Sequence, residues 1–237
     1  MKPILPIAVL GASLILFVVV SLTRADDAAA PAAVPDDYAS VAAGRAARIV
    51  AALALADTTQ SERVTRIVAE QYAKLHAIHE ARDASLAAVK ADAEVLARTL
   101  ATEPAKKTAE VDAEAARRRI LDETTARLYD LHAEYLARLA VELTPAQVDQ
   151  VKDGMTYGVL PNTWRGYQEM LPQMTDEQRR QVLAWLIEAR EHAMDGSTSE
   201  EKHGWFGKYK GRITNYLAAA GYDLKAAEKV WLDSKKK

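Results

Sequence analysis

The chain of 237 residues is predicted to be all-α, with a long antiparallel helical hairpin followed by a C-terminal cluster of shorter helices. Apolar residues recur at three- and four-residue spacing almost throughout, whereas no stretch shows the period-two alternation that a strand requires. All four tryptophans and eight of the ten glycines lie after Glu142. A chemically plain region over residues 38–142 therefore precedes a more varied one over residues 143–237, and the two are expected to pack as one domain.

An apolar run from Ile4 to Leu22 lies near the start of the chain and is followed by the small residues Thr23 and Ala25. This pattern predicts a secretory signal peptide over residues 1–25. The alternative is an uncleaved N-terminal anchor, because the run is nearly long enough to span a bilayer. Residues 26–37 are almost entirely Ala, Pro and Asp, which predicts a tether. The body is therefore expected to be periplasmic or secreted, and without cysteine it holds no disulfide.

Three helices are expected in the plain region. The first covers residues 38–55 with Asp37 as its N-cap, and Asp57 begins the turn and cap of the next. Two apolar stripes of about forty residues each then lie on either side of a break at Glu103-Pro104. Helices of that length joined by a short linker should fold back on each other, each about 55–60 Å long at 1.5 Å per residue.

Capping chemistry predicts where the helices of the varied region begin. Thr144-Pro-Ala-Gln147 and Thr175-Asp-Glu-Gln178 each have the pattern of a capping box. Gly154 is expected to end the first of these helices, before a loop over residues 155–161. Asn162 is then expected to cap a brief helix.

The second capping box should open a helix that reaches about Met194 and is followed by a turn. Ser197 or Thr198 then caps a glycine-rich helix, which Gly221 is expected to stop. Asp223 is expected to cap a final amphipathic helix.

The glycine-rich helix contains residues that a helix built only for stability would avoid. Gly204, Gly207 and Gly211 each weaken a helix interior by roughly 1 kcal/mol relative to alanine. Their presence predicts that another helix or a ligand approaches this backbone closely.

The same helix carries the first candidate binding surface, which consists of Trp205, Lys208, Tyr209, Arg212 and Asn215. At 3.6 residues per turn these side chains fall on neighbouring lines of the helix. Aromatic rings stack on the apolar faces of sugars, and Lys and Arg bind carboxylates, so the surface suits a carbohydrate and in particular an acidic glycan. The alternative interpretation is that the aromatic residues belong to the core and the cations are simply solvated.

A second candidate surface combines Tyr157 and Trp164 with Asn162 and Arg165. Irregular positions on a rigid scaffold commonly carry binding groups. The alternative is an ordinary packed connection between helices.

Histidines supply one pattern that could bind a metal. His76 and His79 stand about one turn apart, and His132 could meet them across the hairpin. Zinc usually needs three or four ligands, so this spacing predicts neither a metal site nor a cofactor.

His192 and His203 flank the expected turn, with Glu188 and Glu191 nearby, and form the only acid–base cluster that the sequence offers. Together with Tyr209, the two histidines define an enzyme hypothesis, a hydrolase or lyase accessory acting on polysaccharide. No phosphate-binding loop, nucleophile elbow, His-Glu-x-x-His motif or cysteine cluster accompanies them.

Several strings of the varied region resemble a known family. Lys152-Asp-Gly-Met-Thr-Tyr-Gly-Val-Leu-Pro161, Phe206-Gly-Lys-Tyr-Lys-Gly-Arg-Ile-Thr-Asn-Tyr216 and Ala220-Gly-Tyr-Asp223 are similar to an exported bacterial family catalogued as domain of unknown function 3826. The resemblance covers most of the chain after the leader. It implies an exported protein with a loosely defined sugar-binding function, and it supplies no catalytic residue.

A weaker resemblance comes from Leu143-Thr-Pro-Ala-Gln147 and Met174-Thr-Asp-Glu-Gln178. Both are similar to the Leu-Thr-x-x-Gln repeats of small helical periplasmic chaperones of the Spy type, although the second has methionine in place of leucine. Capping boxes explain threonine and glutamine at this spacing without such a relationship.

Two functions from different classes follow. The preferred one is an exported helical protein that binds a carbohydrate, and the alternative is a periplasmic chaperone-like or adaptor protein that holds other chains with its long hairpin. Enzyme activity on polysaccharide is less favoured. Nucleic acid is not an expected partner, because the chain is predicted to be exported and carries a formal charge of −2, and a membrane is expected only if the leader stays uncleaved.

Overall fold

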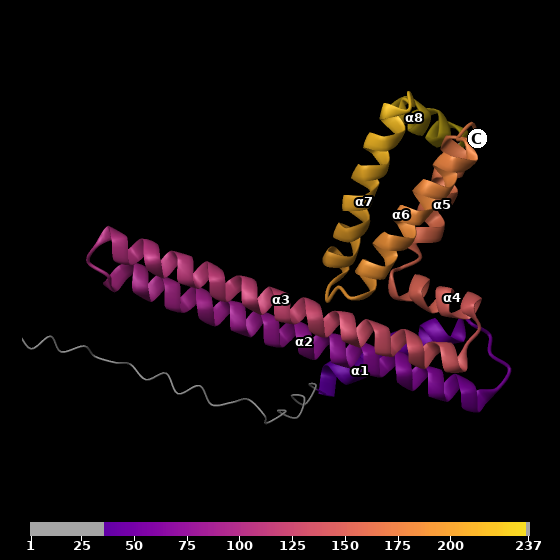
Figure 1. Ribbon diagram of the computed structural model, residues 1–237. Coiled ribbons are helices and arrows are strands. Elements are labelled where there is room, and N and C mark those ends of the chain that lie inside the picture. Colours follow the sequence, from indigo (N-terminus) through magenta and orange to yellow (C-terminus); the bar gives the residue numbers. More distant parts are fainter. Residues whose placement is uncertain (1–35, 236–237) are drawn as a thin grey trace, which may run out of the picture. The chain divides into compact units, whose positions relative to one another are not determined.

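A computed structural model describes residues 36–235, and the helices in this range confirm the all-α prediction (Figure 1). Eight helices and no strand lie within the described range. The expected signal peptide, and all of the expected tether except its last two residues, lie outside it. None of the described helices is both long enough and apolar enough to cross a membrane.

The plain region forms three helices: α1 (Asp36–Ala51), α2 (Thr58–Thr99) and α3 (Glu103–Glu142). Asp57 caps α2 as predicted, because its carboxylate accepts a hydrogen bond of 2.8 Å from the Thr59 amide. The first helix is shorter than expected, since it does not continue to Leu55.

Helices α2 and α3 lie side by side and run in opposite directions (Figure 1). Ion pairs of 2.9 Å join Arg63 near the start of α2 to Glu142 at the end of α3, and Lys74 to Glu134 further along. Such partly exposed pairs contribute little stability. Apolar packing therefore has to hold this end of the hairpin together.

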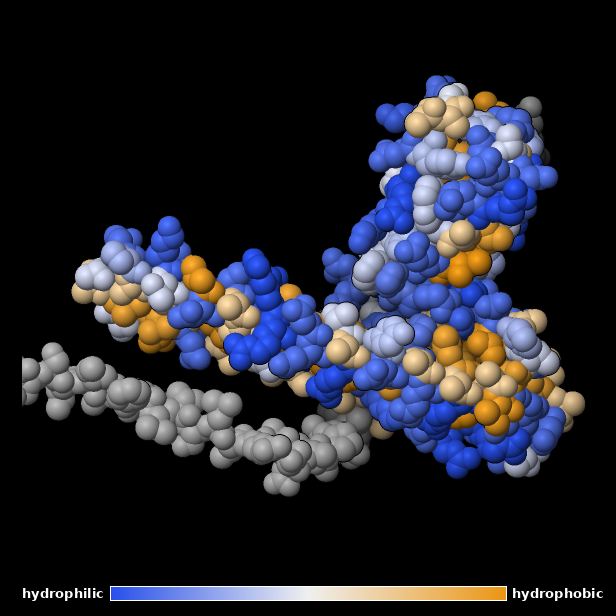
Figure 2. Space-filling view, viewed as in Figure 1, coloured by the Kyte–Doolittle hydropathy of each residue, from blue (hydrophilic) through white to orange (hydrophobic). Residues whose placement is uncertain are grey.

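A first hydrophobic core supplies that packing and joins α1, α2 and α3 to α4 (Pro145–Met155). Its largest fully buried side chains are those of Val50, Val64, Val68, Tyr135, Leu139, Met155 and Met194. The buried residues of α2 end at His79 and those of α3 begin at Thr124. Residues 80–123, called the far hairpin below, therefore have no buried side chain, and apolar and charged groups alternate on their surface (Figure 2).

A second core lies within α5 (Val159–Met170), α6 (Asp176–Met194) and α7 (Ser199–Ala219). Its largest fully buried side chains are those of Leu171, Leu186, Phe206, Ile213 and Leu217. The last helix, α8 (Leu224–Lys235), has no buried residue and packs against this core only through partly buried side chains.

Both predicted capping boxes are confirmed. At the start of α4 the Thr144 hydroxyl accepts from the Gln147 amide at 3.4 Å, and the Gln147 side chain accepts from the Thr144 amide at 3.0 Å. Thr175 and Gln178 exchange the same two bonds, of 3.2 and 2.9 Å, at the start of α6. Two otherwise unpaired backbone amides are thus satisfied at each helix start.

The predicted end of the glycine-rich helix is also confirmed. Gly221 takes a left-handed φ of 91° just after α7, its amide bonds back to Ala218, and the Tyr222 amide bonds back to Leu217. This is the Schellman arrangement, in which glycine relieves the strain of the left-handed residue. Asp223 then caps α8, accepting from the Ala226 amide at 3.0 Å.

The prediction of a loop over residues 155–161 is wrong. Helix α4 continues to Met155 and α5 begins at Val159, so only three residues separate them. Tyr157 makes this tight turn possible by adopting a left-handed φ of 58°. Such a φ is unusual for a residue with a side chain, so no sequence pattern predicts it.

The expected cap of α5 is also wrong. Gly158, with φ of 65°, occupies the cap position, and Asn162 lies inside the helix. Pro161 does not prevent the helix from starting early, because a proline in the first turn removes no intrahelical hydrogen bond.

The glycines of α7 do not mark a contact between helices. A Cβ atom built on Gly204, Gly207 or Gly211 would meet nothing within 4 Å in the described chain beyond the helix itself. Of the two predicted alternatives, the approach of another helix is therefore wrong for the described residues, whereas the approach of a ligand stays a prediction. Close approach occurs instead at Gly154, where a Cβ atom would lie 3.0 Å from Cγ1 of Ile49, so glycine lets α4 pack tightly on α1.

Candidate functional site

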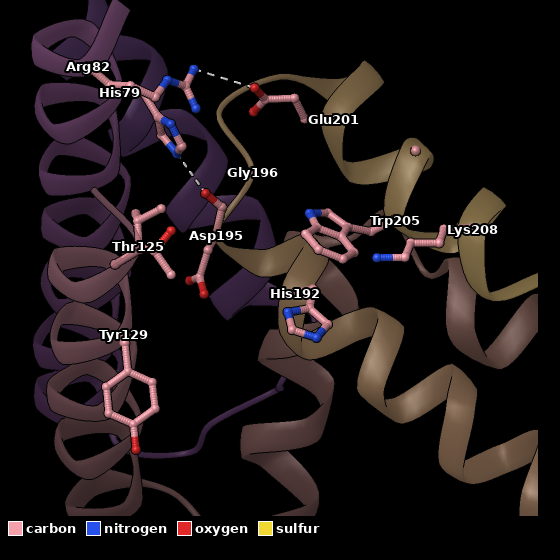
Figure 3. Close-up of a pocket in the computed structure, with 12 residues that line it drawn as sticks. His79, Arg82, Thr125, Tyr129, His192, Asp195, Gly196, Glu201, Trp205 and Lys208 are labelled. Atoms are coloured by element: carbon pink, nitrogen blue, oxygen red, sulfur yellow. Dashed lines mark hydrogen bonds and ion pairs between the residues drawn. The ribbon is translucent and has the colours of Figure 1, made fainter. Parts of the chain in front are cut away.

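A concavity lies between the α2–α3 hairpin and the tip of the α6–α7 hairpin (Figure 3). It has a volume of about 560 Å³, within the usual range for small-ligand sites. We call it the junction pocket. Its lining residues are His79, Arg82, Thr125, Leu128, Tyr129, His192, Asp195, Gly196, Glu201, Gly204, Trp205 and Lys208.

The turn between α6 and α7 forms one wall of the pocket. Thr198 caps α7 and accepts from the Glu201 amide at 3.1 Å, while the Glu201 carboxylate accepts from both the amide and the hydroxyl of Ser197, at 2.7 and 2.8 Å. Burial alone would raise the pKa of Glu201, but the bonds from Ser197 hold it below its usual value. A Cβ atom on Gly196 would lie 3.2 Å from Cγ of Lys202, so the turn is compact.

Asp195 connects this turn to the long hairpin. Its backbone carbonyl accepts from Nε2 of His79 on α2 at 2.7 Å (Figure 3). Its carboxylate pairs with Nδ1 of His132 on α3 at 3.0 Å. Because a carbonyl oxygen can only accept, Nε2 of His79 carries the proton. Nδ1 of this side chain, which is 4% exposed, has no hydrogen-bond partner in the described chain.

His132 is held as a cation. Its imidazole lies between Asp195 and Glu191, with Nε2 at 3.4 Å from the Glu191 carboxylate. Hydrogen bonds to Asp195 and then to Glu191 raise the pKa of His132 to about 9, against the opposing effect of burial. The positive charge therefore persists at neutral pH.

Glu191 extends this network to α4. Its carboxylate also accepts from Lys152 at 2.8 Å, and the neighbouring Arg190 reaches Asp149 and Asp153 at 2.6 and 2.9 Å. Burial would raise the pKa of Glu191, but the bonds from His132 and Lys152 lower it to about 2. The ionic network thus fixes α3, α4 and α6 relative to one another beneath the pocket.

Lys202 fixes α7 in the same region. Its side chain is buried, and Nζ donates to the carbonyls of Met155 at 3.1 Å and Met194 at 3.3 Å, the last residues of α4 and α6. A positive charge at the C-terminal ends of two helices is favourable. Burial nevertheless lowers the pKa of Lys202 to about 8, so the lysine is held close to neutralisation.

Two of the predicted site residues line the junction pocket. Trp205 is half-buried there and stacks on His192 with ring centroids 4.4 Å apart, and Lys208 is exposed with Nζ 4.9 Å from the Trp205 ring. Tyr129 faces the pocket from α3 and is 75% exposed. Figure 3 places Trp205 and His192 on one side and Thr125 and Tyr129 on the other.

Tyr209, Arg212 and Asn215 lie further along α7 and do not line the pocket. Tyr209 is only 4% exposed, so its ring packs under the neighbouring side chains. Burial and a hydrogen bond to Glu188 raise the pKa of Tyr209 to about 12. Arg212 lies over the Tyr209 ring at 5.1 Å, and Asn215 is exposed.

The second predicted surface lies elsewhere. Tyr157 is exposed and stacks on His203 with centroids 5.7 Å apart, whereas Trp164 packs against the second core. Asn162 accepts a hydrogen bond from Arg165 at 2.8 Å. None of these residues lines the junction pocket.

The histidines do not gather into the clusters considered from the sequence. His76 stacks on Tyr38, while His79 and His132 meet at Asp195 through different atoms. No group of three or more potential ligands in the described range is arranged to hold a metal ion.

The expected acid–base cluster is likewise divided. His192 stacks on Trp205, whereas His203 stacks on Tyr157. Glu188 pairs with Arg212 at 3.7 Å, and Glu191 belongs to the internal network.

Sequence reasoning missed most of the pocket. His79, Arg82, Asp195 and Glu201 come together only through contacts between residues more than a hundred positions apart or through the turn that those contacts hold. Tyr129 did leave a signal, because it is an aromatic residue that falls off the apolar stripe of an otherwise plain helix.

The fold and the pocket together define an all-α protein with an aromatic and charged surface site between two helical hairpins. A family model described as Protein of unknown function (DUF3826) matches residues 39–237, and the chain belongs to that family. The match assigns no ligand, activity or site residue. No curated protein matches the chain, and no similarity to Spy-type proteins was found.

Proposed function

We propose that the protein is an exported binding protein and that the junction pocket binds a carbohydrate. The observation that carries the proposal is the position of Trp205, which presents part of its ring to the pocket beside His192 and Lys208. Sugar rings have apolar faces that stack on aromatic rings and hydroxyls that need hydrogen-bond partners. Tyr129 on the opposite wall offers a second exposed ring.

The charges around the pocket favour an acidic sugar. Arg82 is neutralised by Asp83 at 2.7 Å and Glu201 at 3.5 Å, and Asp195 is neutralised by His132. Lys208 has no carboxylate within ion-pairing distance in the described chain. A uronate carboxylate would supply the missing negative charge.

The walls of the pocket also favour binding because they are fixed before any ligand arrives. The bonds of Asp195 to His79 and His132, and that of Glu201 to Arg82, tie α2 and α3 to the α6–α7 turn. A preformed site loses little conformational entropy on binding, so weak contacts to hydroxyl groups are enough for useful affinity.

The experiment is a thermal-shift and calorimetric screen of the mature protein against neutral and uronic-acid oligosaccharides. A ligand at about 100 times its dissociation constant should add roughly 2.7 kcal/mol of apparent stability. Trp205→Ala should abolish the shift, and Lys208→Met should weaken uronic-acid binding more than neutral-sugar binding. Trp231→Ala on α8 is the matched control and should change neither. Absence of binding across both ligand classes would contradict the proposal.

A chaperone-like or adaptor role is the second candidate, and the far hairpin favours it. Val95, Leu96 and Val111 are exposed there, and an exposed apolar surface can hold unfolded segments. The test is whether the protein suppresses aggregation of a reduced, unfolding client, and whether Val95→Ser with Leu96→Ser removes the effect. Protection that also requires Trp205 would contradict a role for the far hairpin.

A further inference from the structure

A continuous row of rings and cations runs along the seam between α6 and α7. It begins at the junction pocket, where Trp205 stacks on His192 at 4.4 Å and 16°, and His192 in turn lies 6.1 Å from the Tyr209 ring at 28°. The two helices run antiparallel, so residues that descend α7 meet residues that ascend α6 (Figure 1).

The row continues away from the pocket. The Arg212 guanidinium lies over Tyr209 at 5.1 Å and over Trp185 at 5.6 Å, and Trp185 meets Tyr216 edge to face at 5.3 Å. Each member contacts the next. We call this set of side chains the aromatic seam: Trp205, His192, Tyr209, Arg212, Trp185 and Tyr216.

Burial divides the seam into a base and a surface. Tyr209 is buried and forms the base, while His192 and Arg212 are exposed and Trp185, Trp205 and Tyr216 are half-buried. The second core lies directly beneath, because the three half-buried rings pack against it. The seam therefore presents ring surface to solvent on a rigid support, which a stacking ligand requires.

The length of the seam exceeds that of one sugar. Residues 205–216 of α7 cover about 16 Å at 1.5 Å per residue. The pocket forms one end, where His79, Thr125 and Tyr129 of the long hairpin face the α6–α7 tip.

We infer that the aromatic seam holds a linear, acidic polysaccharide chain and that the junction pocket receives one end of that chain. The inference rests on the proposed function, since it extends the ligand from a sugar to a polymer. Half-exposed rings spaced along the seam offer successive stacking positions. The Arg212 side chain is 50% exposed, and its ion pair with Glu188 is long, at 3.7 Å. A uronate carboxylate can therefore compete with Glu188 for the guanidinium.

The test is calorimetry with galacturonic-acid oligomers of increasing length, from the disaccharide to long chains. Affinity should rise at least about tenfold between the shortest and the longer oligomers and then level off once the seam is filled. Binding should remain at one protein per chain whatever the length, because each chain has one end of a given kind. Neutral glucan oligomers of matched length provide the comparison for charge.

Variants separate the seam from the pocket. Trp185→Ala and Tyr216→Ala should remove most of the gain from length, about tenfold, and leave disaccharide binding unchanged. Trp205→Ala should weaken every length, and Trp231→Ala should weaken none. Circular dichroism of each variant should be unchanged, since the seam rings are only half-buried.

The outcomes are distinguishable. Equal affinity for all lengths would overturn the seam while leaving the pocket and its function in place. A number of bound proteins that grows with chain length would overturn recognition of a chain end. Failure of the disaccharide and of every longer oligomer to bind would overturn both this inference and the proposed function.

Discussion

The two helical hairpins of this protein share a topology and differ in what their surfaces carry. The α6–α7 hairpin lies on a core of fully buried side chains and presents rings and cations on its open face. The far hairpin has no buried side chain, and its surface mixes alanine and charged residues with a few exposed apolar side chains such as those of Val95, Leu96 and Val111. A rigid support suits the ligand surface proposed for α6 and α7, and the difference predicts that the far hairpin contributes little to the stability of those two helices.

Truncation of a core side chain should produce the largest difference in unfolding free energy between the two hairpins. Phe206→Ala on α7 removes a side chain that is fully buried, and such changes cost about 3–5 kcal/mol of unfolding free energy. Leu96→Ala in the far hairpin removes a side chain that is already 41% exposed, and it should cost less than about 1 kcal/mol. Urea denaturation of both variants measures the difference, and similar costs would show that the far hairpin has a core of its own in solution.

The ionic network beneath the pocket should make stability depend on pH. The pKa of His132 is raised from 6.5 to about 9 in the folded protein, so its contribution is complete below about pH 6.5 and is lost as the pH rises through 9. Between pH 6.5 and 8 the loss should be about 1–2 kcal/mol. The measurement is the unfolding free energy across this pH window for the wild type and for His132→Gln. The pH profile of the variant should be nearly flat.

Lys202 should change the unfolding free energy with pH in the opposite direction to His132. Its pKa is lowered from 10.5 to about 8, so the folded state sheds its proton first and stability should increase as the pH rises from about 8 to 10.5. Lys202→Met should abolish that increase. A wild-type profile that falls steadily from pH 6.5 to 10.5 would show that Lys202 stays charged in the fold.

Replacing each of two glycines with alanine should change the stability of the protein in opposite directions. At Gly154 a new Cβ would press on the buried Ile49 at 3.0 and 3.1 Å, so Gly154→Ala should destabilise the protein by about 1 kcal/mol. At Gly207 nothing lies within 4 Å, so Gly207→Ala should stabilise the helix by about 0.4–1 kcal/mol. Thermal unfolding measures both signs. Stabilisation at Gly154 would mean that Ile49 can move aside.

Local chemistry explains why much of the fold was predictable. Capping boxes, the left-handed Gly221 and the spacing of apolar residues act over a few positions, and each of these predictions is confirmed. The short turn before α5 was not predictable, because Tyr157 adopts a backbone conformation that its sequence does not favour.

Only part of the pocket could be predicted from the sequence, and the reason differs from that for the turn before α5. Trp205 and Lys208 were recognisable because they lie on one helix. Their partners across the pocket depend on how α2 and α3 meet the α6–α7 turn, and the bond from His79 to Asp195 spans 116 positions. No pattern along the chain encodes such a meeting, whereas the exposed Tyr129 could have been noticed as an aromatic residue outside its helix's apolar stripe.

Shortening the far hairpin should have the smallest effect and is the sharpest test of the comparison. Deleting residues 85–98 together with 107–120 removes two heptads from each of the two antiparallel helices, so the remaining parts of α2 and α3 stay in register. The deleted segments contain no buried side chain, and the pocket residues Arg82 and Thr125 remain. The melting temperature should therefore change by no more than a few degrees, about what 1 kcal/mol produces in a domain of this size. Oligosaccharide affinity should be unchanged, whereas suppression of client aggregation should disappear if the hairpin holds other chains. Loss of sugar binding in a variant that remains folded would mean that the far hairpin, and not only the α6–α7 face, shapes the ligand site.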